Sequence, residues 1–285
     1  MTRKGSAVFL DTTIQIARKI HSPPTKKRIA ERIKSYDLTV TGQIVRQEFK
    51  RRFLKDARYL LDLFKRYKSY KDVMHHVVDV LTSFHQRKQK ICLELLATFF
   101  PEELDEDLTD RSILLLKALL EFGLDEFDSS VGHVVRESGC SLAEMPVKKT
   151  RSGYDLGKDR CSGSQDCEVA KFLSKHKSKL EELLTYLSDV EDKAKSDEIR
   201  HIEAFIGDVL KNPDSTSVQL HEPCKTVGDL LIALESTGIP SVYTMNGKES
   251  QHLCRVMSQD LIVRSTNPDH EDVVCSKGDT NWPKF

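Results

Sequence analysis

The sequence has no uninterrupted apolar run of about 18 residues, the length that a transmembrane helix requires. Its first apolar stretch, in MTRKGSAVFLD, is too short for the hydrophobic region of a signal peptide. The seven cysteines are an odd number and include no CxxC pair. We therefore expect a cytoplasmic protein with no membrane partner, in which the cysteines are reduced thiols or, in part, metal ligands rather than a disulfide framework.

The chain also lacks net charge, because 44 lysines and arginines balance 44 aspartates and glutamates. This balance conceals an asymmetry: residues 1–90 hold 22 basic against 8 acidic side chains, whereas residues 91–285 hold 22 against 36. A basic N-terminal third favours a polyanionic partner, most simply nucleic acid. The alternative is that the two parts of the chain pack on each other and neutralise their charges.

What the sequence does contain is the pattern of a globular α/β protein. Short apolar runs predict strands at 7–10, 38–41 and 241–244, with a last strand in QDLIVRS. Helical periodicity predicts helices at 13–20 and 26–35. The stretch HSPPTKK between them is predicted to be a turn, because tandem prolines do not fit inside a helix.

The middle of the chain has a different character. Residues 56–125 and 165–211 are predicted to be mainly helical, while 140–167, with a proline, glycines and three cysteines, indicates an irregular loop. We therefore predict an α/β fold with a parallel sheet flanked by helices and a large helical insertion. The expected parts are a discontinuous core at 1–55 and 200–266, an insertion at 56–199 and a loose tail at 267–285.

Two acids of the N-terminal third stand in unusual positions. Asp11 directly follows a predicted strand, and ligand sites of parallel sheets lie at the carboxyl ends of strands. The alternative is an N-cap for the next helix. Glu48 shares an apolar helical stripe with preceding residues, so its carboxylate needs a strong partner such as a metal ion. Its alternative is an ion pair with Arg51 or Arg52, three and four residues ahead.

Two further acids lie near the C-terminal end of the sequence. Asp229 lies in TVGDLLIAL, where Thr226 and Asp229 also match a helix-capping pattern. Glu249, in MNGKES, follows a predicted strand and can equally be an ordinary first-turn acid that the helix dipole favours.

Taken in order, the contexts FLDTT, TVTGQIVRQEF, GDLLIAL and VYTMNGKES resemble the motifs of the PIN-domain family of nucleases. The resemblance covers roughly residues 6–55 and 215–265. In it, Asp11 corresponds to the first acid of the family, Glu48 to the second and Asp229 to the acid of its D-A-L-I-A-A motif.

The last motif departs most from the family. Asn246 falls where the family has Asn or Asp, and Glu249 falls where its final Asp usually stands, while Ser250 replaces the usual aromatic residue. Either Asn246 or Glu249 therefore completes the site. Thr13 stands at the position of a polar residue two places after the first acid.

The resemblance implies a PIN-like sheet whose clustered acids bind Mg²⁺ or Mn²⁺, with Asp11, Glu48, Asp229 and Glu249 as catalytic ligands and Asn246 beside them. Two such ions about 3.5–4 Å apart can activate a water and stabilise the leaving oxygen of a phosphodiester. Carboxylates crowded in this way repel one another without a cation, which raises pKa values. The implied activity is endonucleolytic hydrolysis of RNA.

A basic segment follows Glu48 directly. Lys50, Arg51, Arg52 and Lys55 can bind the phosphates that flank the scissile bond, with Thr13 nearby. The tyrosines at 59, 67 and 70 can stack bases if they are exposed. The alternative is an amphipathic helix with a solvated basic face.

The cysteines suggest a second metal. Cys140, Cys161 and Cys167 lie in or beside the irregular loop, and with Cys224 they can form a structural Zn²⁺ site, in which His221 is an alternative ligand. Free thiols are the other interpretation. Cys92 and Cys254 are expected to be buried thiols in helices.

Two other functions compete with a nuclease. The imperfect last motif favours a PIN-like module that binds RNA or a protein without cutting. Phosphohydrolases that open with an hhhhDxDxT motif also place an Asp after a strand, but here Thr13 occupies the position of their second acid.

Overall fold

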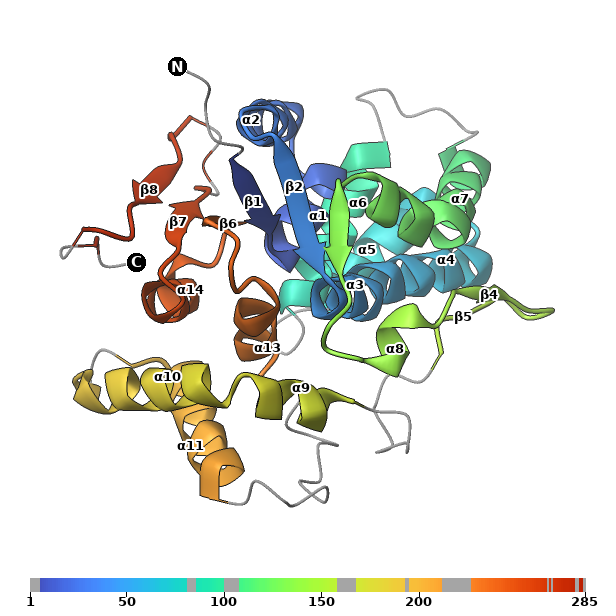
Figure 1. Cartoon of the computed structure of the whole chain (residues 1–285). Helices are drawn as coiled ribbons and strands as arrows, with labels where there is room; N and C mark the ends of the chain where they lie inside the picture. The colour runs from blue at the N-terminus through green and yellow to red at the C-terminus, as the bar shows by residue number, and fades with distance from the viewer. Residues whose placement is uncertain are drawn as a thin grey trace.

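The computed structural model describes residues 6–80, 86–99, 108–157, 168–192, 195–211, 227–265, 267, 269–279 and 282–283. Its main sheet has the strand order β3-β2-β1-β6-β7-β8, in which all neighbours are parallel except β7 and β8 (Figure 1). The strands are β1 (Ala7–Leu10), β2 (Leu38–Gly42), β3 (His133–Val135), β6 (Ser241–Thr244), β7 (Asp260–Val263) and β8 (Val273–Cys275).

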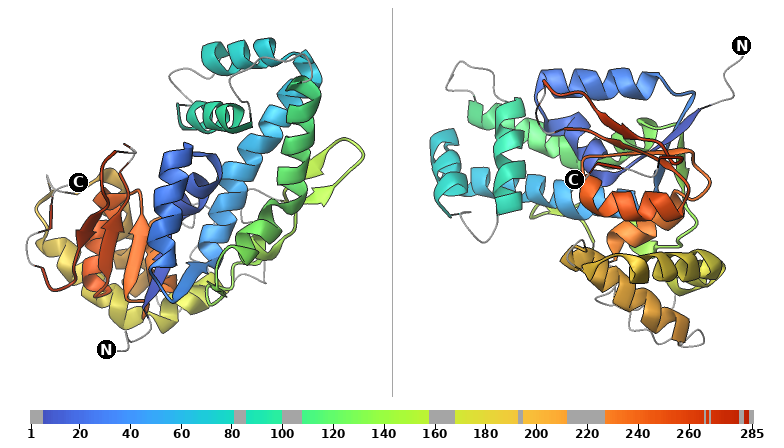
Figure 2. Two further views of the ribbon diagram at one scale, coloured as in Figure 1. Left: turned by 90° about the horizontal axis from the view of Figure 1, so that it is seen from above. Right: turned by 90° about the vertical axis from the view of Figure 1, so that its left-hand side faces the viewer.

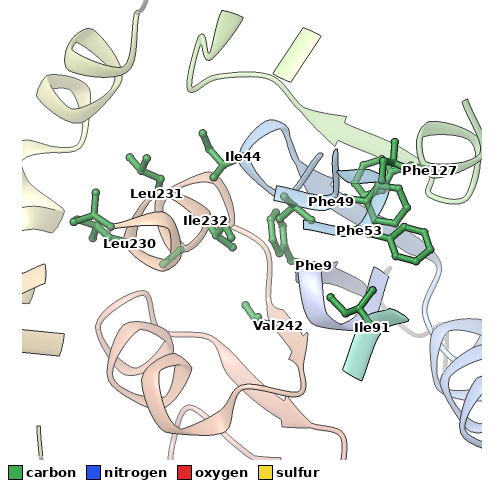
Figure 3. Close-up of a cluster of buried hydrophobic side chains, with 14 of the residues drawn as sticks. Phe9, Ile44, Phe49, Phe53, Ile91, Phe127, Leu230, Leu231, Ile232 and Val242 are labelled. Carbon is green, nitrogen blue, oxygen red and sulfur yellow. The ribbon is translucent and has the colours of Figure 1, made fainter. Parts of the chain in front are cut away.

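Helices cover both faces of this sheet, because successive strand side chains point to opposite faces. Val8 and Leu10 pack with residues of α1 (Thr12–Ile20) and α2 (Pro23–Lys34). Phe9, between them, belongs to a larger core with α3 (Gln43–Phe49), α13 (Gly228–Glu235) and α14 (Gly247–Val256). Figure 3 shows Phe9 and Val242 of the sheet among side chains of α3 and α13.

One helical rod leads from the sheet into the middle of the chain. α3 continues through a π-helix, η1 (Lys50–Leu54), into α4 (Lys55–Tyr67). Phe49 and Phe53 of this rod are fully buried, and the Phe49 ring packs 5.0 Å from that of Phe127. α4 runs beside α7 (Leu108–Ser129) away from the sheet, towards α5 (Tyr70–Val80) and α6 (Gln86–Phe99) (Figure 2).

A second group of helices lies against the C-terminal part of the core. It comprises α9 (Val169–Lys175), α10 (Lys177–Asp189) and α11 (Asp197–Lys211), and α10 packs on α14 (Figure 1). The segment that joins β3 to these helices contains the short α8 (Ser141–Glu144) and a two-stranded ribbon of β4 (Lys148–Lys149) and β5 (Tyr154–Asp155).

The α/β class predicted from the sequence is confirmed, and 7–10, 38–41 and 241–244 are parallel strands of one sheet. Several details differ from expectation, among them α8, β4 and β5 within the segment 140–167 that was expected to be an irregular loop. Pro23 and Pro24 do not form a turn but begin α2. Proline is tolerated there because the backbone N–H groups of the first helical turn make no hydrogen bond within the helix. β3 joins the sheet from within the expected insertion, and β8 lies in the tail expected to be loose. No helix in the described ranges is long and apolar enough to cross a membrane.

A candidate acidic site at the carboxyl edge of the sheet

The direction of chain progression reverses at β1. From β1 the chain adds β2 and β3 on one side, and later β6 and β7 on the other. In open parallel sheets the loops at such a reversal diverge and leave a crevice at the carboxyl ends of the strands. Asp11 directly follows β1 and Thr244 ends β6, so both lie at this crevice.

Asp11 is 9% exposed and is held by three hydroxyl or amide donors. Its Oδ1 accepts the Thr12 N–H at 2.5 Å, as a helix N-cap does. Its Oδ2 accepts hydrogen bonds from Thr13 Oγ1 at 2.9 Å and from Thr244 Oγ1 at 2.7 Å. The capping interpretation is therefore correct, and the same carboxylate also faces a pocket between helices.

Glu48 is 3% exposed and is linked to Asp11 through one residue. Thr12 donates its hydroxyl to Glu48 Oε2 at 3.0 Å, while its amide binds Asp11. The expected ion pairs exist, since Glu48 Oε1 lies 2.9 Å from Arg52 Nη2 and 3.5 Å from Arg51 Nη2. Glu48 Oε1 nevertheless is buried and accepts no hydrogen bond. It lies against the start of α13, where a Cβ added to Gly228 would be only 2.8 Å away.

Asp229 lies one residue after Gly228, so the folding of α13 places it beside Glu48. Burial is the main cause that raises the pKa of Asp229 well above its usual range, and the charges of Asp11, Glu198 and Glu48 add to it, opposed by Arg52. Asn246 Nδ2 donates to Asp229 Oδ2 at 3.3 Å. Thr226, the expected cap of α13, lies outside the described residues.

Glu198, in the first turn of α11, is the site acid that sequence reasoning missed. Its side chain interacts with that of Asp229, which brings the start of α11 to the acidic site. Burial raises the pKa of Glu198, and the charge of Glu249 raises it further. Glu249 itself occupies the first turn of α14, close enough to act on Glu198. Nothing in the sequence around Glu198 distinguishes it from other first-turn acids.

The site contains a small pocket with a volume of about 20 Å³. Asp11 and Asp229 both line it, together with residues of β6 and α14 such as Val242, Ser250 and Cys254. This room suits a water or a bare ion rather than an organic molecule. In the part of the chain that the structure describes, no three His, Cys, Asp or Glu side chains are grouped closely enough to hold a metal ion as they stand.

The basic residues after Glu48 divide between two environments. Arg51 and Arg52 lie on η1 and pair with Glu48, which brings guanidinium groups to the acidic site. Lys50 is 3% exposed and points elsewhere: its amine donates to the carbonyl oxygens of Leu142 and Met145, the latter at 3.1 Å. Lys50 therefore anchors the segment around α8 and does not present its charge to a nucleic acid.

Lys55 is partly buried and begins α4, one turn beyond Arg51 and Arg52.

The tyrosines of α4 and α5 contact other side chains of the helical region. Tyr59 and Tyr67 share His76 at hydroxyl–ring nitrogen distances of 3.0 and 3.1 Å, and the Tyr70 ring stacks on Phe64. The amphipathic-helix interpretation fits these tyrosines better than base stacking.

The cysteine predictions are tested only in part. Cys140 is half-buried, while Cys161, Cys167, Cys224 and the alternative ligand His221 lie outside the described residues. Cys92 and Cys254 are confirmed as buried thiols in α6 and α14. Burial raises the pKa of the Cys92 thiol to about 12, so it is inert at neutral pH.

Ion pairs within the protein neutralise part of the charge asymmetry. Basic residues of the N-terminal third pair with acids beyond residue 90, as in Lys19–Glu126 at 2.7 Å, Arg46–Asp128 at 2.8 Å and Arg32–Asp272 at 3.0 Å. Internal neutralisation therefore accounts for some of the basic surplus.

In comparisons of the chain with family models, curated proteins and solved structures, none matches.

Proposed function

We propose that this protein is a nuclease that depends on Mg²⁺ or Mn²⁺, built on a PIN-like core and acting on RNA as an endonuclease. The observation that carries the proposal is the meeting of Asp11 and Asp229 in one pocket at the sheet reversal, with Glu48 joined to Asp11 through Thr12. The resemblance of the local motifs to those of PIN nucleases adds weight to this choice of chemistry.

The chemistry of the donor set suits a hard divalent cation, although the carboxyl groups would have to move closer together to hold one. Asp11, Glu48, Asp229 and Glu198 offer carboxylate oxygens, the ligands that Mg²⁺ and Mn²⁺ prefer. The raised pKa of Asp229 arises partly from neighbouring negative charges, which a cation would relieve. Glu48 Oε1 accepts no hydrogen bond, so a cation that replaces its ion pair with Arg52 would bind it without breaking one. A bound divalent ion would supply an acidified water for attack on phosphorus.

The remaining roles fall to groups of the chain itself. Thr13 and Thr244 hold the Asp11 carboxylate in one orientation, and Asn246 does the same for Asp229. Arg51 and Arg52 lie next to Glu48, where they can bind a phosphate that flanks the scissile bond and screen its charge from the acids. Glu249, in the first turn of α14, stands at the rim through its proximity to Glu198.

A non-catalytic module that binds RNA or a protein through the same crevice is the second candidate. The pairing of Glu48 with Arg52 favours it, because an internal cation already compensates one of the acids. In that case the pocket would bind without hydrolysis, and neither Mg²⁺ nor Mn²⁺ would change the RNA.

The test is cleavage of single-stranded RNA by the purified protein in Mg²⁺, in Mn²⁺ and in chelator. Asp11→Asn keeps the helix cap but removes the charge, so we expect the cleavage rate to fall at least about 100-fold, equivalent to about 2.7 kcal/mol of transition-state stabilisation. Asp62→Asn, which removes an exposed carboxylate of α4, is the matched control and should leave the rate unchanged. RNA that stays intact with every metal while still binding the protein would favour the second candidate.

A further inference from the structure

The two helices that carry Glu48 and Asp229 are tied together by a buried carboxyl group outside the pocket. α3 begins after Gly42, which has no side chain to cap the free N–H groups of the first turn. Glu235, the last residue of α13, takes this role from another helix. Both of its oxygens accept the Ile44 N–H, at 3.0 and 3.3 Å.

The fit around Glu235 leaves no spare room. Glu235 is 3% exposed, and a Cβ added to Gly42 would lie 2.0 Å from Glu235 Oε2. The backbone of Gly42 is extended, with φ at −114°, so any residue could adopt it. The glycine is therefore needed for the close approach of the carboxyl group and not for its backbone conformation.

The contact has a counterpart at the opposite ends of the same helices. Glu48 lies in the last turn of α3 and packs against Gly228 at the start of α13, while Glu235 at the end of α13 meets the start of α3. The helices are thus antiparallel neighbours with a carboxyl group at each end of their contact. Ile44 and Ile232 fill the shared core between these ends (Figure 3).

We propose that Glu235 is a positioning residue that sets the separation of Glu48 and Asp229. The inference rests on the proposed function, since these are the acids of the proposed nuclease site. Glu235 does not line the pocket, and its contacts are with α3 and with Ser138 after β3. It acts by fixing where α3 lies along α13, because a shift of one helix against the other would move both carboxylates together with their backbones.

The first experiment compares Glu235→Leu with Glu235→Gln in the full chain. Leucine removes both acceptors, whereas glutamine keeps one oxygen for the Ile44 N–H. We expect Glu235→Leu to lower kcat for RNA cleavage about 10-fold or more, because small misplacements of catalytic groups are costly, while KM for RNA stays within about 2-fold. Mn²⁺ affinity, measured by the loss of the free-ion spin-resonance signal, should weaken in parallel. Glu235→Gln should recover most of both.

Two further variants keep the test decisive if Glu235→Leu folds poorly. Gly42→Ala leaves Glu235 in place but drives its carboxyl group off Ile44, so it should reproduce the loss of kcat and Mn²⁺ affinity. Leu116→Ala, a buried change in α7, is a general destabilisation control and should alter neither when assayed well below its melting temperature.

The outcomes separate the inference from the function on which it rests. A wild-type protein that neither binds Mn²⁺ nor cleaves RNA overturns both. An active wild type, with Glu235→Leu and Gly42→Ala no different from Leu116→Ala, overturns the positioning role alone. Loss in those two variants with recovery in Glu235→Gln supports it.

Discussion

Burial raises the pKa of a carboxyl group at each end of α13, yet the neighbours of the two groups differ in kind. Around Asp229 the charges of three other acids, Asp11, Glu198 and Glu48, raise its pKa further, and the charge of Arg52 opposes them. Around Glu235 the neighbours are mainly neutral donors, the Ser138 hydroxyl and the N–H groups of Ile44 and Gln43. Burial is the main cause that raises the pKa of Glu235 to about 8, and the charge of Glu137 adds a smaller contribution. A raised pKa therefore does not by itself mark a binding site. Mutual repulsion, which a cation can relieve, distinguishes the Asp229 end from the satisfied Glu235 end.

Removing the charge at the Asp229 end should produce the largest effect on activity and little loss of stability. Asp229→Asn is expected to lower the RNA cleavage rate about 100-fold, or about 2.7 kcal/mol, while its melting temperature holds or rises because one of several repelling charges is gone. Parallel rate measurements and thermal melts test this. A lower melting temperature with unchanged cleavage would show that Asp229 serves the fold and would remove the contrast with Glu235.

The opposite result is expected at the Glu235 end. Glu235→Ala leaves the buried Ile44 N–H without its acceptor and opens space beside Gly42, so the free energy of unfolding should fall by about 2 kcal/mol. Urea denaturation of the variant and of Asp229→Asn, side by side, measures the difference. Equal stability of Glu235→Ala and wild type would contradict the capping role.

The pH dependence of stability sharpens the same contrast. Since the pKa of Glu235 is raised from 4.5 to about 8, the folded state binds its proton more tightly than the unfolded state. The protonated Glu235 therefore contributes fully to the free energy of unfolding below about pH 4.5. This contribution is lost as the pH rises to about 8, and the free energy of unfolding falls by up to about 1.4 kcal/mol per pH unit. Glu235→Gln has no proton to lose, so its stability should fall less steeply over this window. Identical slopes in urea titrations would show that the group ionises as in the unfolded chain.

The smallest expected effect is on the salt dependence of RNA binding, and it concerns two neighbouring basic residues, Arg52 and Lys50. Arg52 lies at the acidic site, whereas Lys50 is enclosed by carbonyl oxygens near α8. In the Asp11→Asn background, Arg52→Gln should reduce the salt dependence of RNA binding by about 0.7 in logarithmic slope, the share of one phosphate contact. Lys50→Gln should leave that slope unchanged and lower stability instead. Fluorescence anisotropy over a salt series distinguishes the two, and equal slopes would remove Arg52 from the binding surface.

The sequence was most informative where local pattern and tertiary position coincide. Asp11 was recognisable because a short apolar strand ends on it, and Glu48 because it interrupts an apolar helical stripe. β1, β2 and β6 were predictable because each is a short apolar run between polar or turn-forming residues. Lys50 shows the limit of such reasoning: it adjoins Arg51 and Arg52 in the sequence, and only the carbonyl groups near α8 reveal that it is structural.

Other features had no local signal. β3 and β8 are three-residue strands whose pairing is decided by the neighbouring strand rather than by their own pattern. Glu198 and Glu235 look like ordinary helical acids, and their importance comes from groups far away in the sequence, Asp229 and Ile44. A tertiary contact of this kind cannot be read from the spacing of residues in one chain segment.

The position of β1 in the sheet also affects how the protein is made. β1 pairs with β2 early in the chain but with β6 only when Val8 meets Ser241. About 200 residues separate β2 from the end of β6, which corresponds to roughly 10–40 s of synthesis at about 5–20 residues per second. Until then Asp11 and Glu48 lack both Asp229 and the helices that enclose the pocket. A nuclease built in this order would leave the RNA of its own ribosome uncut while the chain is still emerging.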